Sequence, residues 1–479
     1  SNPKTAGLAE SAQRDLEAAI GMLQADDADV LPKATEVFAG AEFESLVHAL
    51  RRAIDGQGRI CFSGCGATGR LSILLEVSWR QFWQDLQVRH PAIAAKLPPL
   101  EHRVVSIMTG GDYALIRSVE NFEDHQVFGR QQVREAGLGK GDVLVAISEG
   151  GETSSVIGTI WQALDNGAEV FFAFNNPAAL LAQHIERSRQ VIEDSRVTIL
   201  DLSSGPMGVA GSTRMQATTS ELLVVGAALE TALNQVLREK LDAADLVRLG
   251  IAEAAPADYS RWFGELLREL SQPAAVAALA AMVRYEEQLY RSHGLVTYMA
   301  DQCLLDIFTD TTERSPTFML PKFRRCDDPV SPPPWAFVKN PQLPTPQAWR
   351  AVLHRDPRCL SWNAETYREL GAPAGIQANP PHLASEDMFQ FLIGNEDDPS
   401  RYRVAANAAI CIVLGDEIPR LGQADDPLRV AFGIGARPFA QRAVLAVGPA
   451  APPGDVAPVS WHVGVQTGTS PLRLREHLA

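Results

Sequence analysis

Residues 59–70 read Arg-Ile-Cys-Phe-Ser-Gly-Cys-Gly-Ala-Thr-Gly-Arg, a short apolar run followed by a loop of small residues. The run predicts a buried strand, and the apolar periodicity that follows predicts a helix from about Arg70 to Trp83. A glycine loop between a strand and a helix leaves backbone N–H groups unpaired at the helix start, where the helix dipole is positive. This stretch therefore predicts an anion-binding loop at the carboxyl end of a buried strand.

A second loop of the same kind follows another predicted strand. Residues 148–155 read Ser-Glu-Gly-Gly-Glu-Thr-Ser-Ser and come directly after the apolar run 143–147. Hydroxyls and free N–H groups at a helix start suit a phosphate dianion, whereas ordinary capping by Thr153 or Ser154 needs no ligand. We expect the side chain of Glu149 to turn away to solvent, because a carboxylate is unfavourable beside a phosphate. The candidate phosphate-binding residues are Gly66, Ala67, Thr68, Gly69, Ser148, Glu149, Gly150 and Thr153.

Strands and helices alternate through the first half of the chain. Apolar runs at 104–108, 170–174 and 197–200 add three predicted strands, and helical periodicity separates them. The runs are apolar throughout, which is typical of strands that are buried on both faces of a parallel sheet. We therefore predict a doubly wound α/β domain whose ligand site lies beyond the carboxyl ends of the strands.

The second half of the chain has a weaker pattern that still indicates an α/β unit. The predicted elements are helices at 8–24, 43–55, 258–270, 274–290 and near 401–414, and strands at 294–299, 442–447 and 461–465, with the proline-rich stretch 327–347 as loop. The predicted organisation is a helical segment (1–40), a doubly wound parallel-sheet domain (41–240), a helical connector (241–291) and a divergent second α/β domain with a strand-rich tail (292–479).

Composition limits the classes of function. The 479 residues carry a formal net charge of −15, which disfavours wholesale binding to nucleic acid phosphates. No apolar run reaches the roughly 18 residues of a membrane span, and we expect no signal peptide. The six cysteines are scattered without Cys-x-x-Cys spacing, which indicates free thiols in a reducing compartment. We therefore expect a cytoplasmic protein with no metal, no cofactor, no nucleic acid partner and no membrane partner.

The spacing Gly64-x-Gly66-x-x-Gly69 also matches the fingerprint of dinucleotide-binding folds. That fingerprint expects an acidic residue roughly 20 positions further on, at the end of the next strand. Here the next predicted strand ends near Met108, about twice as far along, and a second phosphate-type loop has no place in the scheme. Dinucleotide binding is thus a remote alternative, beside a tight strand–helix turn that holds no ligand.

The motifs together resemble those of a known family. Ser-x-x-Gly-Glu-Thr after a strand resembles the phosphate loop of sugar isomerase (SIS) domains. The order of Gly-Cys-Gly-x-x-Gly-Arg, Gly110-Gly111-Asp112, Glu123-Asp124 and Gly211-Ser212-Thr213-Arg214-Met215 resembles the branch that contains N-acetylmuramic acid 6-phosphate etherase and glucokinase regulatory protein. The match covers roughly residues 40–240, and the segment 313–318 (Glu-Arg-Ser-Pro-Thr-Phe) resembles a second-domain motif. The resemblance implies two tandem SIS domains in one chain.

Site residues follow from this resemblance. In the etherases a glutamate eight residues after the arginine of the glycine loop takes part in catalysis, and Ser78 stands there in this chain. Its counterpart in the second domain is Glu313, whereas Ala300-Asp301-Gln302-Cys303 replaces a glycine loop in that domain. Glu123 matches the other family glutamate, which sits on a helix near the sugar. Arg403 matches a basic ligand-binding residue of the regulatory protein.

The resemblance implies one composite site for a hexose or amino-sugar 6-phosphate, with loops from the first domain and Glu313 from the second. The main expectation is a regulator that responds to the sugar phosphate and signals to a protein partner, for example a sugar kinase. The alternative is an enzyme in which Glu123 and Glu313 move protons. Removal of the C2 proton leads either to aldose–ketose isomerisation or, with expulsion of a C3 group, to the elimination that the etherases catalyse.

Overall fold

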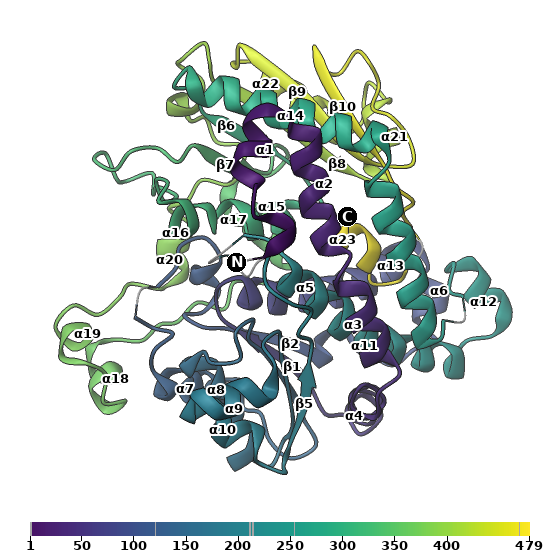
Figure 1. Ribbon diagram of the computed structural model, residues 1–479, viewed down its shortest axis with the longest axis vertical. Helices are drawn as coiled ribbons and strands as arrows, with labels where there is room; N and C mark the ends of the chain where they lie inside the picture. The colour runs from purple at the N-terminus through teal and green to yellow at the C-terminus, as the bar shows by residue number, and fades with distance from the viewer. Residues whose placement is uncertain (1, 120, 210–211, 213–214, 253, 469) are drawn as a thin grey trace.

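The computed structural model describes residues 2–119, 121–209, 212, 215–252, 254–468 and 470–479 (Figure 1). Two five-stranded parallel sheets form the cores of two α/β units, one in the lower and one in the upper half of the view in Figure 1. The predicted α/β fold class is confirmed.

The first sheet is parallel throughout, in the order β2-β1-β3-β4-β5. Its strands are β1 (Ile60–Gly64), β2 (Val104–Met108), β3 (Val143–Ile147), β4 (Glu169–Phe174) and β5 (Val197–Asp201). Its helices are α5 (Gly66–Arg89), α6 (Pro91–Ala94), α7 (Gln126–Ala136), α8 (Ser154–Asp165), α9 (Ala178–His184) and α10 (Glu186–Ile192), with short 3-10 turns η2 (Glu101–Arg103) and η3 (Asp112–Leu115). Every residue of β1 and β3 is buried, as the uninterrupted apolar runs predicted.

The second sheet repeats this topology. Its strands are β6 (Val296–Met299), β7 (Ala336–Lys339), β8 (Ala408–Leu414), β9 (Gln441–Gly448) and β10 (Val459–Gly464). Listed from β7 their order is β7-β6-β8-β9-β10, and all neighbours are parallel. Therefore β6 corresponds to β1, β7 to β2 and β8 to β3. Its helices are α15 (Leu304–Thr311), α16 (Arg314–Phe318), α17 (Thr345–Leu353), α18 (Ala364–Glu369), α19 (Ala374–Ala378), α20 (Ser385–Met388), η4 (Pro399–Arg401), α21 (Glu417–Leu421), α22 (Pro427–Ala436) and α23 (Leu474–Leu478).

Two predicted elements of the second half are wrong. The expected helix near 401–414 is the strand β8, because the β-branched residues Ile410, Ile412 and Val413 outweigh the alanines that precede them. The proline-rich stretch 327–347, expected to be loop, contains the whole of β7 and the start of α17. Its prolines flank the strand and open the helix, where a missing N–H costs nothing.

Helices at the chain start and in the middle join the two units. They are η1 (Pro3–Thr5), α1 (Leu8–Arg14), α2 (Leu16–Asp27), α3 (Val30–Phe38), α4 (Ala41–Asp55), α11 (Gln216–Lys240), α12 (Ala243–Arg248), α13 (Pro256–Leu270) and α14 (Pro273–Arg291). The expected single helix at 8–24 is broken at Asp15, which caps α2 by accepting the N–H of Ala18. Across the described ranges no single helix combines the length and apolarity of a bilayer span, and α13 with α14 passes that test only as a pair bent by 61°.

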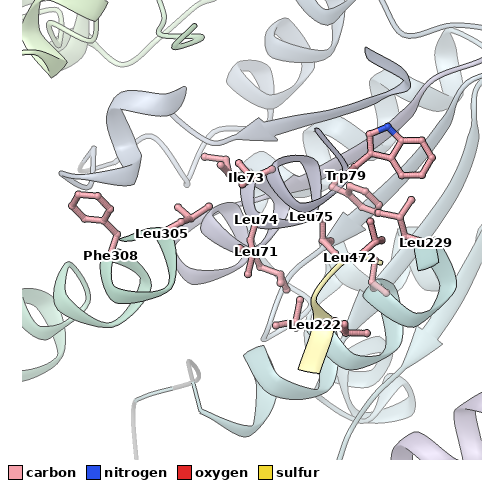
Figure 2. Close-up of a cluster of buried hydrophobic side chains, with 14 of the residues drawn as sticks. Leu71, Ile73, Leu74, Leu75, Trp79, Leu222, Leu229, Leu305, Phe308 and Leu472 are labelled. Carbon is pink, nitrogen blue, oxygen red and sulfur yellow. The ribbon is translucent and has the colours of Figure 1, made fainter. Parts of the chain in front are cut away.

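The two units share one hydrophobic core. Figure 2 shows its centre, where leucines of α5 and α11 meet Leu305 and Phe308 of α15 and Leu472 near the chain end. Trp79 of α5 is fully buried there, and its indole N–H donates to Leu100 O at 2.8 Å. Helix α5 thus belongs to the first unit by sequence but packs on both.

A long segment of the second unit, residues 354–393, also crosses onto the first. In Figure 1 its helices α18 and α19 project beside α7. Trp362 stacks on Phe122 with ring centroids 5.6 Å apart, and its indole N–H donates to Glu135 at 2.7 Å. This contact holds the turn that precedes α7.

Candidate active site

The first glycine loop is shorter than expected, because α5 begins at Gly66 and not near Arg70. Gly66 has φ of +57°, a left-handed value that favours glycine. The Thr68 hydroxyl turns back to the preceding residue, accepting the N–H of Cys65 at 3.0 Å and donating to Cys65 O at 2.8 Å. The Thr68 side chain is therefore a cap, and only backbone N–H groups of this first turn are left for a ligand.

Two other glycines of the loop have a packing role. A Cβ on Gly64 would lie 2.4 Å from Thr68 C, and one on Gly69 would lie 2.7 Å from Met108 Cγ. Both distances are too short for a real side chain. The glycine spacing therefore lets the first turn of α5 lie directly against β1 and β2.

A cavity of about 210 Å³ opens at the start of α5 and is lined by both units. From the first unit come Cys65, Gly66, Met108, Thr109, Ala114, Ile116, Arg117, Ser118, Val119 and Glu123, and from the second come Thr311, Thr312, Glu313, Ser315, Pro316, Pro321, Lys322 and Phe323. It lies at the carboxyl edge of the first sheet, the usual ligand position of such folds.

Glu123 reaches this cavity from a turn before α7, and not from a helix as the resemblance implied. The turn is tied down by its main chain, since Glu123 O accepts the N–H of Ser155 at 2.9 Å at the start of α8. The exposed side chain places Oε2 3.4 Å from the Cys65 thiol. Burial raises the pKa of that thiol far above its usual range, with the Glu123 charge adding to the effect. Cys65 is therefore a proton-bearing neighbour of the carboxylate.

Glu313 reaches the same cavity from the second unit, at the residue before α16. Its Oε1 forms an ion pair with Arg70, which has no exposed side-chain surface. Arg70 also donates through Nε to Leu115 O at 3.1 Å. A Cβ on Gly66 would lie 3.8 Å from Glu313 Oε1, so the carboxylate stands directly over the start of α5. The structure thus brings Glu123, Glu313 and Gly66 together.

The second predicted loop does not line this cavity. Ser148 is buried, and its hydroxyl shares a hydrogen bond of 3.0 Å with the Thr153 hydroxyl. Gly150 is partly exposed beside them. Ser155 links the loop to the cavity lining, since its hydroxyl lies 2.8 Å from that of Thr109 and its N–H donates to Glu123 O.

The expectation for Glu149 is wrong. Its side chain is half-buried, and it accepts the Thr218 hydroxyl of α11 at 3.1 Å. The carboxylate turns to α11 because the Thr218 hydroxyl offers it a hydrogen bond there. Fully buried Glu221 is its neighbour, and burial together with the Glu149 charge raises the pKa of Glu221 well above its usual range.

Arg403 lies apart from the other predicted site residues. It is exposed in the turn before β8, at the amino edge of the second sheet, and is not among the cavity residues. Sequence reasoning instead missed Arg117 and Lys322, the two basic residues of the cavity lining. The local sequence gives no signal for either residue, because neither belongs to a recognisable motif after β2 or α16.

The segment that precedes the motif 211–215 is held by the chain start. Asn2 donates to Pro206 O at 2.6 Å, and the Thr5 hydroxyl donates to Gly208 O at 2.6 Å. Gly211, Thr213 and Arg214 of this motif lie outside the described residues. Among those that are described, no group of three or more His, Cys, Asp and Glu side chains is arranged to hold a metal ion.

Comparison with known proteins supports the motif resemblance. Residues 43–164 match the family model described as the glucokinase regulatory protein N-terminal SIS domain. N-acetylmuramic acid 6-phosphate etherase 1 of Bacillus licheniformis is 30% identical over 172 residues, 35% of this chain and 47% of that protein. The etherase of Aliivibrio fischeri is 31% identical over 184 residues, 38% of this chain and 53% of that protein. The chain spans about half the length of these curated relatives.

A similar solved structure is the C-terminal domain of glucosamine-fructose-6-phosphate aminotransferase from Francisella tularensis, with a TM-score of 0.46 at 10% identity over 97% of this chain and 93% of that chain. Over residues 43–164 the first unit is therefore similar to an SIS domain, in line with its parallel five-stranded sheet. The proteins that this unit resembles are named as N-acetylmuramic acid 6-phosphate etherases and as the glucokinase regulatory protein.

Proposed function

We propose that the cavity at the start of α5 binds a hexose or amino-sugar 6-phosphate and that the protein is a lyase of the etherase kind. The observation that carries this proposal is the meeting of Glu123, from one α/β unit, and Glu313, from the other, at one cavity. The similarity of the first unit to proteins named etherases supports a lyase over a pure sensor.

The cavity offers suitable partners for a phosphate. The first backbone N–H groups of α5, at Gly66 and Ala67, open beside it at the positive end of a 24-residue helix. Arg117 and Lys322 add two cationic side chains to its lining. These local groups compensate for the net charge of −15, which otherwise repels an anion.

The two carboxylates have separable roles. Glu123 is exposed on a turn and is free to turn onto a bound sugar, whereas the Arg70 ion pair holds Glu313 in one direction. We assign Glu123 to removal of the C2 proton from the open-chain sugar. The C2–H electron pair then forms a C2–C3 double bond as the C3–O bond breaks; Glu313 orients the departing group, whose oxygen takes up the proton that Glu123 removed or one from water.

We extend the proposal to the organisation of the chain. Residues 41–240 and 292–479 each contain one complete five-stranded sheet, which supports two domains joined by the helical segments 1–40 and 241–291. Ser78 occupies the position at which the resemblance expects a second catalytic glutamate, and its hydroxyl is bonded to Leu74 O. We therefore expect one active cavity per chain and not two.

A sensor is the second candidate, and Ser78 together with the family-model match favours it. In this case the sugar phosphate binds between Glu123 and Glu313 without turnover, and a protein partner such as a sugar kinase responds in the cytoplasm. A sensor needs no second catalytic glutamate, so it explains directly why Ser78 stands at that position.

A phosphorus and proton NMR time course in deuterated buffer separates the candidates. The full chain is mixed in turn with the 6-phosphates of glucose, fructose, N-acetylglucosamine and N-acetylmuramic acid. Lactate release supports the lyase, and aldose–ketose interconversion indicates an isomerase at the same cavity. Line broadening of one sugar without any turnover overturns the lyase and supports the sensor.

A further inference from the structure

A second cavity, of about 670 Å³, lies at the equivalent edge of the second sheet. It is lined by the loop after β6 and the segment after β7, with α5 opposite, just as the first cavity is lined by the segments after β1 and β2 with the end of α15 opposite. Its lining is Leu74, Val77, Gln81, Gln84, Asp301, Gln302, Leu304, Leu305, Arg350, Ala351, Val352, His354, Arg355, Asp356 and His477.

The anion position of this second sheet is already filled by the protein itself. Glu417, at the start of α21, is fully buried and accepts the N–H of Gln302 at 3.2 Å after β6. Its other oxygen accepts the N–H of Leu414 at 3.0 Å at the end of β8. Both N–H groups lie near the carboxyl ends of neighbouring strands, and Glu417 occupies them. These two backbone donors are therefore not available to a phosphate.

The charged side chains of the lining are also engaged. Arg355 binds Asp112 and, at 3.1 Å, Glu76 of the first domain. Arg350 pairs with Asp356 at 2.6 Å, and Asp301 pairs with Arg420 at 3.4 Å. Each of these charged side chains is paired with an opposite charge. The lining therefore does not favour an ionic ligand.

A hydrogen-bond chain fixes one ring nitrogen of His354 as an acceptor. The Gln84 amide nitrogen donates to Glu101 at 2.8 Å and to His354 O at 3.0 Å, so Gln84 Oε1 must accept from His354 Nδ1 at 2.8 Å. Burial lowers the pKa of His354 to about 4, so the ring is neutral at pH 7. Its Nε2 therefore carries a lone pair.

Amide groups complete a set of uncharged partners. Gln81 is half-buried, and its amide forms no hydrogen bond with the described residues. Gln302 uses its amide oxygen to bind Arg473, which leaves its NH₂ group as a donor. Leu74, Val77 and Leu305 provide an apolar wall beside these groups. Neutral donors and acceptors beside an apolar wall are what a sugar ring, with hydroxyls at its edge and C–H groups on its faces, requires.

We propose that this second cavity binds a neutral, hydroxyl-rich ligand of the class of an unphosphorylated sugar. The site does not depend on the function proposed for the first cavity. Because α5 lines both cavities, through Gly66 at one end and through Gln81 and Gln84 further along, ligands of the two cavities contact the same rigid helix.

Titration of the full chain with N-acetylglucosamine, glucose and mannitol, followed by calorimetry and ligand-observed NMR, tests this proposal. We expect saturable binding of at least one of the three. Gln81→Leu should weaken it by about 3- to 10-fold, the effect of losing a neutral hydrogen bond. Gln87→Leu, at an exposed position of the same helix, is the matched control and should leave it unchanged.

A second variant keeps the proposal testable if Gln81→Leu does not fold. His354 has a left-handed backbone, with φ of +49°, which asparagine tolerates, so His354→Asn should keep the fold and weaken binding. Binding that persists in excess inorganic phosphate and in Glu313→Gln supports a site separate from the first cavity. The proposal is overturned if none of the three compounds binds, if phosphate displaces the one that does, or if both variants bind it like the wild type.

Discussion

Glu123 and Glu313 reach the first cavity by different means. Glu123 stands on an exposed turn that one main-chain hydrogen bond ties to α8. Glu313 is fixed by an ion pair with buried Arg70, whose remaining bonds go to main-chain oxygens of the first unit. One carboxylate is therefore adaptable and the other is preorganised, a pairing that suits proton removal by the first and positioning by the second.

At the scale of single residues, Glu123→Gln should retain binding of the sugar phosphate and lose proton transfer. The amide keeps the size and the hydrogen-bonding oxygen but does not accept a proton. We expect exchange of the C2 proton with deuterated solvent to fall by about 10²- to 10⁴-fold, as measured by proton NMR. Asp124→Asn, an exposed neighbour outside the cavity lining, is the control. Exchange at the wild-type rate in Glu123→Gln contradicts the assigned role.

The two glycine loops make different predictions for phosphate binding. Gly66→Ala should weaken it, because alanine is strained at φ of +57° and its Cβ enters the space below Glu313. Ser148→Ala should change the dissociation constant by less than about threefold, since the Ser148 hydroxyl is used by Thr153 outside the cavity. If loop 148–153 holds the phosphate instead, Ser148→Ala costs about 1–3 kcal/mol in a calorimetric titration.

At the scale of elements, a buried carboxylate of α5 takes part in holding the second unit against the first. Glu76 of α5 has no exposed surface and accepts hydrogen bonds from Arg80, Arg355 and Arg358, with N···O distances of 2.8 to 3.1 Å. Burial alone opposes its ionisation, but the arginines outweigh burial and lower the pKa of Glu76 to about 2. The segment after α17 is thereby held against α5.

Glu76→Gln should therefore destabilise the protein strongly. The change leaves three buried or half-buried guanidinium groups without their shared anion, a loss of about 3–5 kcal/mol in the free energy of unfolding. Denaturant titration at neutral pH measures it. Glu42→Gln on the surface of α4 is the control and should have little effect. A Glu76→Gln loss below about 1 kcal/mol contradicts this account of the domain contact.

The strands of the first sheet were predictable because each is a short run that is apolar on both faces. The glycine loops were predictable because a strand-to-helix turn needs small residues. The strand β8 was not, since the alanines at its start favour a helix and its β-branched residues show their preference only once the segment is buried in the sheet. The cavity partners Arg117 and Lys322 were not predictable either. Arg117 meets Glu123 through the folding of the first unit and Lys322 through the packing of the second unit on it, and local sequence encodes neither contact.

At the scale of the whole molecule, two buried carboxyls make stability depend on pH. Burial raises the pKa of both Glu230 and Glu417 to about 7, against hydrogen bonds that favour ionisation. In the unfolded chain each carboxyl ionises near 4.5. The folded state therefore binds more protons between these values. The stability that the two protonated carboxyls contribute to the folded state is complete below pH 4.5 and is lost as the pH rises through about 7.

Unfolding by denaturant at pH 5 and pH 8 should show this dependence. We expect the free energy of unfolding to be lower at pH 8, by an amount on the order of 3 kcal/mol for each carboxyl at most. Glu230→Gln removes one ionisation and should flatten the dependence. A stability that is equal at both pH values in the wild type contradicts the raised pKa values.

The whole account depends on one cavity that is lined by both α/β units. The most direct test is the rate of lactate release from N-acetylmuramic acid 6-phosphate by the wild type and by Glu313→Gln, followed by proton NMR on the full chain. We predict release by the wild type and a loss of at least about 10²-fold in the variant, with folding verified by its thermal unfolding. Equal release by both proteins contradicts the shared site, and no release by the wild type contradicts the lyase.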